Sequence, residues 1–264
     1  MVSAVVENTV VENTVADTTV SEKYSPGRAE AAIGLTGKVA RAQVLLGAIA
    51  ADYAPAVFAN SFGAEDMVLT DLIAKDFPGI EIFSLDTGRL PEETYKLMQE
   101  VGERYGIRPR VYFPHAETVE SYAREHGPNA FFNSLALRKA CCHMRKVEPL
   151  RRALAGKRAW ITGLRRAQAV TRGDLLESEF DADHGMQKFN PLADWSEREI
   201  WAYIREYQVP YNALHDRGYP SIGCAPCTRA ITPGEDIRAG RWWWEDAQGK
   251  ECGLHPKADP ELNN

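Results

Sequence analysis

Residues 54–73 read APAVFANSFGAEDMVLTDLI, and this stretch decides the fold class. Its first part, Ala54–Asn60, is a short apolar run typical of a buried strand. From Met67 onward, apolar residues recur at helical spacing. The residues between them, Ser61–Asp66, include the glycine expected of a turn. The stretch therefore predicts a strand, a turn and a helix in succession.

The same alternation continues on both sides of this stretch. A helix over Lys38–Tyr53 is expected before the first strand, and Asp194 or Ser196 can cap a helix that runs through Tyr207. The further strands expected are Ile80–Leu85, Arg110–Phe113 and Ala159–Gly163. Strands that alternate with helices of this length pair in parallel and carry helices on both faces of the sheet. The predicted fold class is α/β, a parallel sheet with flanking helices.

The 264 residues suit one large domain with appendages. Residues 1–30 contain a tandem VENTV repeat with no aromatic anchor, so we expect a disordered tail. Residues 31–210 form the predicted nucleotide-binding α/β domain. Residues 211–264 are rich in Gly, Pro, Cys and Trp and have too few apolar periods for a core of their own. We expect this C-terminal segment to pack on the same domain and to carry site residues.

Composition excludes several classes of protein. A net charge of -6 argues against a general nucleic-acid binder, and no apolar run approaches the roughly 18 to 20 residues of a membrane span. The N-terminus lacks the features of a secretory signal or a transit peptide, which favours a cytoplasmic protein. In a reducing cytosol, the five cysteines are better explained as metal ligands or reactive thiols than as disulfides. The oligomeric state stays open, a homo-oligomer included.

Two turns that follow strands are the first candidates for a ligand site, because ligands of open parallel sheets bind where strands end. Ser61 and Gly63 can expose backbone N–H groups to an anion at a helix N-terminus. The alternative is an ordinary N-cap and tight turn. In Asp86-Thr87-Gly88-Arg89, the Asp and Thr can bind a ribose or a base and the Arg a phosphate or sulfate. The alternative there is a structural turn with a solvated Arg.

Positive charge is concentrated in one stretch of an otherwise acidic chain. Residues 138–172 contain eleven Lys and Arg and one acid, a net +10, so the rest of the chain carries -16. An anionic ligand is the natural inference, although a solvated basic helix face is the commoner origin of such a run.

Two pairs of cysteines point to a metal or cluster site. Cys141 and Cys142 are adjacent, and Cys224 and Cys227 form a C-x-x-C. Adjacent ligands would strain a tetrahedral zinc site, whereas an iron–sulfur cubane spreads its ligands over four irons. We therefore prefer a cluster to zinc. A redox C-x-x-C is the next alternative, although this pair lies in a Gly/Pro-rich segment rather than at the start of a helix.

The fifth cysteine, Cys252, lies near the C-terminus, where exposure is expected. An exposed thiol beside His255, or near a cationic site, can have a lowered pKa and act as a nucleophile. An incidental surface cysteine is the alternative.

The chain resembles the assimilatory adenylyl-sulfate reductase family over about residues 38–256. The motifs that carry the resemblance are SFGAED, LDTGRLPEETY, RKACCHMRKVEPL, WITGLRR, CAPCTRAI and ECGLH, in this order. The resemblance implies a fold of the adenine-nucleotide alpha-hydrolase type, with the Ser61 turn similar to a modified pyrophosphate loop. That turn departs from the Ser-Gly-Gly-x-Asp-Ser form of ATP pyrophosphatases, which argues against ATP cleavage.

The resemblance also implies a cofactor and roles for individual residues. The branch of the family that has both cysteine pairs holds a [4Fe-4S] cluster and reduces adenylyl sulfate. The branch without them reduces 3′-phosphoadenylyl sulfate (PAPS). By resemblance, the cluster ligands are Cys141, Cys142, Cys224 and Cys227. The residues implied in binding the phosphosulfate are Lys146, Arg238, Arg241 and either Arg165 or Arg166.

The implied reaction uses Cys252 as nucleophile. Its thiolate attacks the sulfate sulfur, AMP leaves, and thioredoxin or glutaredoxin then releases sulfite from the enzyme thiosulfonate. Three alternatives remain: PAPS reductase activity, a cluster-bearing ATP pyrophosphatase, and a non-catalytic metal-binding module.

Overall fold

The structure, a computed structural model, describes residues 28–168, 172–245 and Leu254. Within these residues no helix is both long enough and apolar enough to cross a membrane. The predicted N-terminal tail, apart from its last three residues, lies outside the described part of the chain. The domain limits proposed from the sequence remain a prediction.

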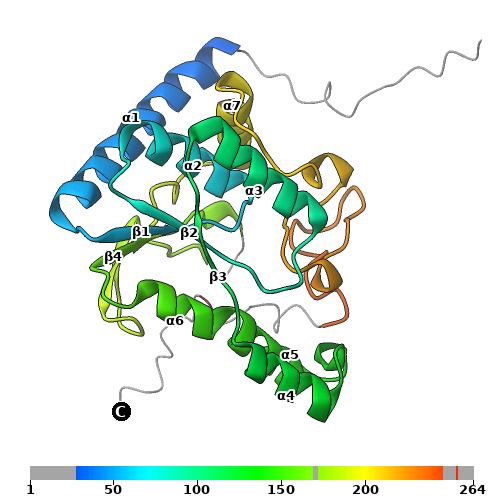
Figure 1. The fold of residues 1–264 in the computed structure, drawn as a ribbon. Coiled ribbons are helices and arrows are strands. Elements are labelled where there is room, and N and C mark those ends of the chain that lie inside the picture. Colours follow the sequence, from blue (N-terminus) through cyan, green and yellow to red (C-terminus); the bar gives the residue numbers. More distant parts are fainter. Residues whose placement is uncertain (1–27, 169–171, 246–253, 255–264) are drawn as a thin grey trace, which may run out of the picture.

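A six-stranded sheet of order β3-β2-β1-β4-β6-β5 forms the centre of the molecule (Figure 1). The strands are β1 (Ala56–Ala59), β2 (Glu81–Leu85), β3 (Arg110–Tyr112), β4 (Ala159–Ile161), β5 (Ser178–Asp181) and β6 (Met186–Phe189). Strands β1 to β4 pair in parallel, with Val57 opposite Glu81 on one side and Trp160 on the other. The four strands and the α/β class expected from the sequence are confirmed.

Two strands were not predicted, and one of them breaks the all-parallel pattern. β6 pairs in parallel with β4, whereas β5 runs antiparallel to β6 at the sheet edge. The two form a hairpin whose turn contains Gly185 at a φ of 65°. So short a connection can only join antiparallel strands. Both strands mix polar with apolar residues, SEFD in β5 and MQKF in β6, so neither has the continuous apolar run that revealed β1 and β4.

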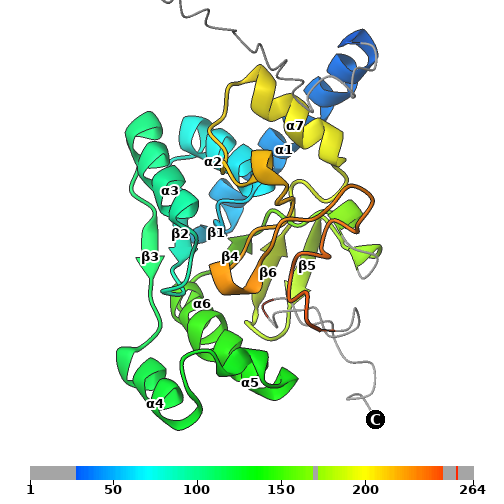
Figure 2. The ribbon, with the colours of Figure 1, turned by 90° about the vertical axis from the view of Figure 1, so that its right-hand side faces the viewer.

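Helices cover both faces of the sheet (Figures 1 and 2). The α-helices are α1 (Arg28–Asp52), α2 (Ala64–Asp76), α3 (Glu92–Tyr105), α4 (Ala116–His126), α5 (Leu135–Cys142), α6 (Glu148–Leu154) and α7 (Glu197–Glu206). Helices α1, α2, α3 and α7 lie on one face, and α6 lies on the other with α4 and α5 beside it. α1 begins ten residues before the predicted helix, inside the stretch assigned to the tail.

Each face of the sheet has its own apolar core. Phe58 of β1 faces a large cluster that includes Leu46 of α1 and Val68 of α2. The neighbouring residue, Val57, faces a smaller cluster with Leu154 of α6. Alternate side chains of β1 therefore serve opposite cores, as expected for a central strand covered on both faces.

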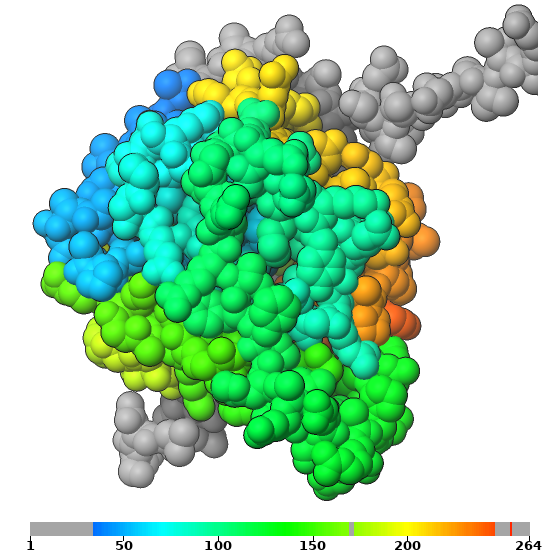
Figure 3. Space-filling model, in the orientation of Figure 1, coloured from blue at the N-terminus to red at the C-terminus, as the bar shows by residue number. Residues whose placement is uncertain are grey.

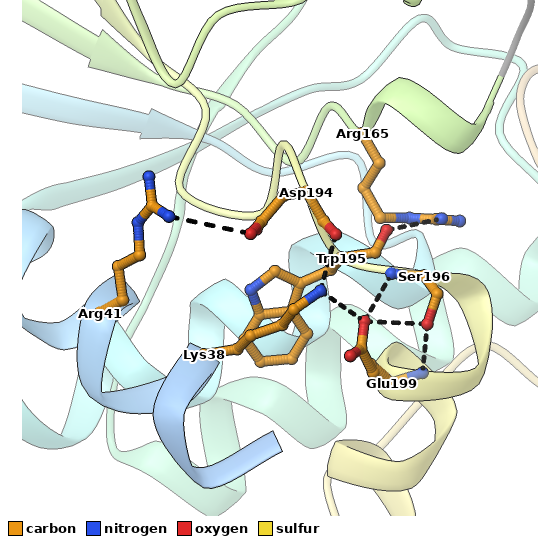
Figure 4. Close-up of polar contacts among 7 residues, drawn as sticks. All are labelled: Lys38, Arg41, Arg165, Asp194, Trp195, Ser196 and Glu199. Atoms are coloured by element: carbon orange, nitrogen blue, oxygen red, sulfur yellow. Dashed lines mark hydrogen bonds and ion pairs between the residues drawn. The ribbon is translucent and has the colours of Figure 1, made fainter. Parts of the chain in front are cut away.

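Polar contacts fix α7 against α1 (Figure 4). Ser196 is the N-cap of α7 and forms a capping box with Glu199, which decides between the two caps expected from the sequence. Lys38 of α1 donates to the Glu199 carboxylate and to the Asp194 carbonyl, at 2.8 and 2.7 Å. Arg165 donates to the Trp195 carbonyl at 3.2 Å. The loop before α7 is thereby joined to the end of β4, where the site described below begins.

The buried carboxylate of Asp71 joins three helices. It accepts hydrogen bonds from Tyr105 of α3, Tyr203 of α7 and Lys75 of α2, each at 2.8 Å. Asp71 is fully buried, and burial next to this carboxylate raises the pKa of both tyrosines. The three donors satisfy an anion that could not otherwise be buried.

Removing the Asp71 carboxylate is expected to destabilise the fold. Asp71→Ala leaves two tyrosine hydroxyls without their acceptor, at a cost of about 3 kcal/mol in the free energy of unfolding. Urea denaturation of the variant and the wild type measures this loss. The control is Glu92→Gln, which breaks the exposed pair with Lys96 and should cost less than about 0.5 kcal/mol. Equal losses in the two variants would show that Asp71 is not the junction of these helices.

Candidate functional site

A pocket of about 280 Å³ opens at the carboxyl ends of the central strands. Asn60 follows β1, Leu85 ends β2 and Thr162 follows β4, and all three line it. The segment after Tyr211 closes the other side, with Gly223 and Arg241 in the wall. Figure 3 shows this segment, in orange, beside the residues that follow β2, in teal. The pocket therefore occupies the position that open parallel sheets use for ligands.

The Ser61 turn lines the pocket, but the hydrogen-bond donors of Ser61 are directed back to a side chain of the turn itself. The backbone N–H and the hydroxyl of Ser61 both donate to the Asp66 carboxylate, at 2.7 and 2.6 Å. The N–H that the sequence suggested for an anion is therefore engaged within the turn. Gly63, not Ser61, is the N-cap of α2. Phe62 between them adopts a left-handed φ of 61° while its side chain is buried, so packing holds a strained backbone at the pocket.

Asp66 is a buried acid in the pocket wall. Burial raises the pKa of Asp66 to about 7, and the neighbouring Glu65 charge adds to the effect, while the two Ser61 hydrogen bonds oppose it. Gly163 lies against this carboxyl: a Cβ at position 163 would come within 2.1 Å of an Asp66 oxygen. Glycine is needed there because of this close approach.

Five cations line the pocket: Lys146, Arg165, Arg172, Arg238 and Arg241. Arg165, buried to 3% exposure, pairs with Glu65 at 2.6 Å. Arg166 does not line the pocket and donates to the Leu175 carbonyl at 2.8 Å. Of the two alternatives left open by the sequence, the structure places Arg165 at the site.

Arg241 is set into the wall by a second close approach. Its side chain passes so near Gly223 that a Cβ there would lie 2.3 Å from the guanidinium. The guanidinium stacks on Trp242 at 4.8 Å and donates to the Ile222 carbonyl at 3.1 Å. A rigid, buried cation therefore faces the pocket at this point.

The turn after β2 is divided between the pocket and a neighbouring cavity. Of Asp86-Thr87-Gly88-Arg89, only Thr87 lines the pocket. Asp86 accepts from the Gly88 N–H and from Tyr95, at 2.7 and 2.9 Å. Arg89 donates to Asn129 and stacks on Phe131. The structure does not bring Asp86, Gly88 and Arg89 into the pocket.

The four cysteines of the two pairs converge in this second cavity. Cys141, Cys142, Cys224 and Cys227 are buried, are free thiols and line one space. Lys146 lines both this cysteine cavity and the pocket. The Thr87 hydroxyl lies 3.2 Å from Cys224 Sγ. Among the described residues, no three His, Cys, Asp or Glu side chains are arranged to hold a single metal ion.

Burial and the charges around the cysteine cavity give its thiols different pKa values. Burial raises the pKa of Cys227 to about 12, and the charges of Cys224 and Cys142 add to this. Burial and the Cys142 charge also raise the pKa of Cys141. At Cys224, burial is outweighed by Lys146, the Thr87 hydrogen bond and Arg241, so its pKa is lowered. Of Cys141, Cys224 and Cys227, Cys224 is therefore the thiol most readily ionised.

The sequence analysis did not predict the backbone conformation of the segment that carries Arg145 and Lys146. Residues His143–Val147 form a π-helix directly after Cys142, and Arg145 and Lys146 lie on it. Such segments occur often at functional sites. The sequence has no signal for it, since nothing in HMRKV distinguishes a π-helix from the α-helices on either side.

The sequence analysis counted Arg138 in the basic run of residues 138–172 but did not predict that it is buried. Arg138 is fully buried and lines the cysteine cavity. It pairs with Glu245 at 2.7 Å and stacks on Trp242 at 4.6 Å. Through these contacts the last described turn before residue 246 is fixed to the helix that carries Cys141.

The predicted nucleophile, Cys252, and its neighbour His255 lie outside the described residues. Leu254 is described: it lines the pocket and packs against the apolar cluster under β1 and β2.

Comparison with known proteins identifies the family. The model described as the phosphoadenosine phosphosulfate reductase domain matches residues 55–230. The chain belongs to this family. The adenosine 5'-phosphosulfate reductase of Allochromatium vinosum is 56% identical over 221 residues, covering 84% of this chain and 86% of that protein. The enzyme of the same name from Burkholderia cepacia is 55% identical, with coverages of 84% and 88%.

Solved structures agree with this assignment. The phosphoadenylyl-sulfate (PAPS) reductase of Candida auris, in a phosphate complex, matches with a TM-score of 0.63 and 29% identity, over 79% of this chain and 99% of that chain. An FMN adenylyltransferase of Candida glabrata matches with a TM-score of 0.56 and 15% identity, over 91% and 82%, a likeness of fold alone. The family resemblance and the fold type expected from the sequence are confirmed.

Replacing Asp66 should change how the stability of this reductase-family chain depends on pH. Its pKa of about 7 exceeds the ordinary value of about 3.9, so the folded state holds the proton more tightly than the unfolded state. This contribution is present in full below about pH 4 and is lost as the pH rises through about 7. From about pH 5 to about pH 8, the thermal midpoint should fall more steeply in the wild type than in Asp66→Asn. Parallel curves would mean that Asp66 ionises normally in the folded chain.

Proposed function

We propose that this chain reduces adenylyl sulfate to sulfite and AMP in sulfate assimilation, in the cytoplasm. The observation that carries the proposal is that a cationic pocket and a cavity of four thiols share one wall, at Lys146. A substrate with a phosphate joined to a sulfate needs such a row of cations. The relatives named adenosine 5'-phosphosulfate reductase support this substrate.

The cysteine cavity fits a [4Fe-4S] cluster. Four buried thiols from two distant parts of the chain line it, together with four cations, Arg89, Arg138, Arg145 and Lys146. A cubane held by four thiolates is anionic and needs positive charge around it. Nε of Arg145 is buried and has no hydrogen-bond acceptor among the described residues, which leaves a donor beside the cavity for such a group.

Bound there by Cys141, Cys142, Cys224 and Cys227, the cluster would supply a fixed anionic centre beside the sulfate end of the pocket. Lys146 lines both the cysteine cavity and the pocket, so its ammonium can attract both the cluster and the sulfate. The two electrons of the reaction come from thiols, so no step requires the cluster to change its oxidation state.

Cys252 is the proposed nucleophile. The support is chain length: Leu254 lines the pocket, and two residues of chain span at most about 7 Å. The thiolate attacks the sulfate sulfur, the bond from sulfur to the phosphate oxygen breaks, and AMP leaves with that electron pair. Lys146, Arg241 and the other pocket cations offset the charge that builds up when one anion attacks another.

A dithiol protein of the thioredoxin class completes the reaction. One of its thiolates attacks Cys252 Sγ of the thiosulfonate, a mixed disulfide forms, and sulfite departs with the electrons of the broken S–S bond. The second thiol of the partner then resolves the mixed disulfide and returns Cys252 as a thiolate. The partner is oxidised by two electrons and the sulfate sulfur is reduced by two.

The proposed function is tested by turnover of adenylyl sulfate. With reduced thioredoxin, the wild type should release sulfite and AMP in equal amounts. Cys252→Ser should lower this rate about a thousandfold or more, because the hydroxyl replaces the only proposed nucleophile. Without thioredoxin, intact-protein mass spectrometry should detect one sulfonate on the wild type and none on Cys252→Ser.

Three controls separate the rival functions. A faster rate with 3′-phosphoadenylyl sulfate would instead identify a PAPS reductase. AMP formed from ATP without any sulfonucleotide would indicate an ATP pyrophosphatase. Iron and sulfide in a preparation that releases no sulfite would indicate a non-catalytic module. Undiminished turnover by Cys252→Ser would exclude the thiosulfonate mechanism.

Removing one proposed ligand should remove the cluster. Cys224→Ser is expected to lower bound iron and acid-labile sulfide about tenfold or more, since an alcohol is a poor ligand in place of a thiolate. Both are measured chemically and by visible absorption. The matched control is Met144→Leu, a buried, volume-conserving change beside the same cavity, which should keep its iron. Equal iron in both variants, or zinc in place of iron, would contradict the cluster assignment.

A further inference from the structure

His215 presents hydrogen-bonding atoms that no described residue uses. It begins the short 3-10 helix His215–Arg217 and lines the pocket. Both ring nitrogens are buried, and neither has a hydrogen-bond partner within residues 28–168, 172–245 and 254. The ring packs edge-on against Trp201, with the centroids 5.2 Å apart at 82°. Because buried polar atoms in native proteins nearly always have a partner, this imidazole is expected to find one in a ligand.

The surroundings of His215 favour the neutral ring. Burial lowers the pKa of His215, against the opposing effects of Glu65, the Tyr219 carbonyl and Asp216. The Tyr219 carbonyl lies close enough to affect this pKa but outside hydrogen-bond geometry to either ring nitrogen. A neutral imidazole offers one donor and one acceptor. It therefore suits an uncharged group that can both accept and donate, rather than a phosphate or a sulfate.

The pocket has two chemically different ends. At the end formed by the cysteine cavity, Lys146 and Arg241 provide positive charge. At the end formed by α7, the wall includes Glu197 and Trp201. His215 belongs to the second end through its contact with Trp201, and the Glu65 charge that acts on it is paired with Arg165 at 2.6 Å. The phosphosulfate thus belongs at the first end and the uncharged part of the ligand at the second.

We infer that His215 binds an uncharged donor–acceptor group of the nucleoside, either a ribose hydroxyl or the amino edge of the base. This inference rests on the proposed function, which supplies an adenine nucleotide as the ligand. His215 is then a specificity-determining residue that contributes to nucleotide affinity and has no part in sulfur chemistry.

The test measures AMP binding by calorimetry to the full-length chain and its variants. His215→Phe keeps the aromatic packing on Trp201 but removes both ring nitrogens, so AMP affinity should fall about tenfold. His215→Asn supplies a donor and an acceptor and should recover part of the loss. The matched control is His126→Phe on the exposed face of α4, outside the pocket, with affinity unchanged to within about twofold.

Three analogues identify the group that His215 contacts. Binding of 2′-deoxy-AMP, 3′-deoxy-AMP and inosine monophosphate is measured with the wild type and with His215→Phe. The analogue that lacks the contacted group should bind both proteins equally, because the interaction is already absent. Should His215→Phe fold poorly, His215→Asn carries the same comparison.

Each remaining outcome overturns the inference. AMP affinity in His215→Phe within about twofold of the wild type would show that the ring makes no ligand contact. An equal loss for AMP and for all three analogues would assign His215 to the phosphate end instead. A wild type that does not bind AMP at all would contradict the proposed function, and this inference with it. Sulfite release with unaltered AMP binding in the variants would leave the function standing and exclude only the role of His215.

Discussion

Shared positive charge between the pocket and the cysteine cavity is the constraint on which the site depends. Burial by itself raises the pKa of a thiol, as it does at Cys227, so four buried thiols are compatible with thiolate chemistry only beside cations. Lys146 provides that charge to Cys224 and at the same time faces the pocket. A substitution that kept the fold but moved this ammonium would disturb both cavities, because Lys146 is the cation that lines the two of them.

The architecture explains how this charge is held in place. The π-helix that presents Lys146 lies between Cys142 and α6, so its position is set by buried neighbours at both ends. On the opposite wall, Arg241 fits against Gly223 and stacks on Trp242, which is itself stacked on the buried Arg138. The cations are thus part of packed structure rather than solvated side chains. Their charge is preorganised, which is the condition under which charge stabilises a reaction most.

Much of this arrangement could be predicted from the sequence, and the rest depends on contacts that the sequence does not express locally. Strands β1 and β4 are apolar runs bounded by turns, so the sequence pattern revealed them, whereas β5 is a polar edge strand and β6, between β4 and β5, mixes polar with apolar residues and is held by pairing on both sides. Convergence of the cysteine pairs was predicted from their chemistry. That Arg165 and not Arg166 reaches the pocket depends on Glu65, a hundred residues away in sequence. Nothing in the sequence singles out His215 within the segment after Tyr211, and only the tertiary structure shows its buried ring nitrogens.

The Ser61 turn differs physically from a loop that wraps the pyrophosphate of ATP. A loop that wraps a pyrophosphate points its backbone N–H groups at the ligand. Here the Ser61 N–H and hydroxyl both donate to Asp66, and the Phe62 N–H donates to the Asn60 side chain at 2.7 Å. Two of the donors of such a loop are therefore already occupied within the protein, and the acids Glu65 and Asp66 lie next to them. The charge that the pocket does present comes from Lys146 and Arg241, which line it and also lower the pKa of Cys224, so its positive charge is concentrated beside the cysteine cavity rather than at the Ser61 turn.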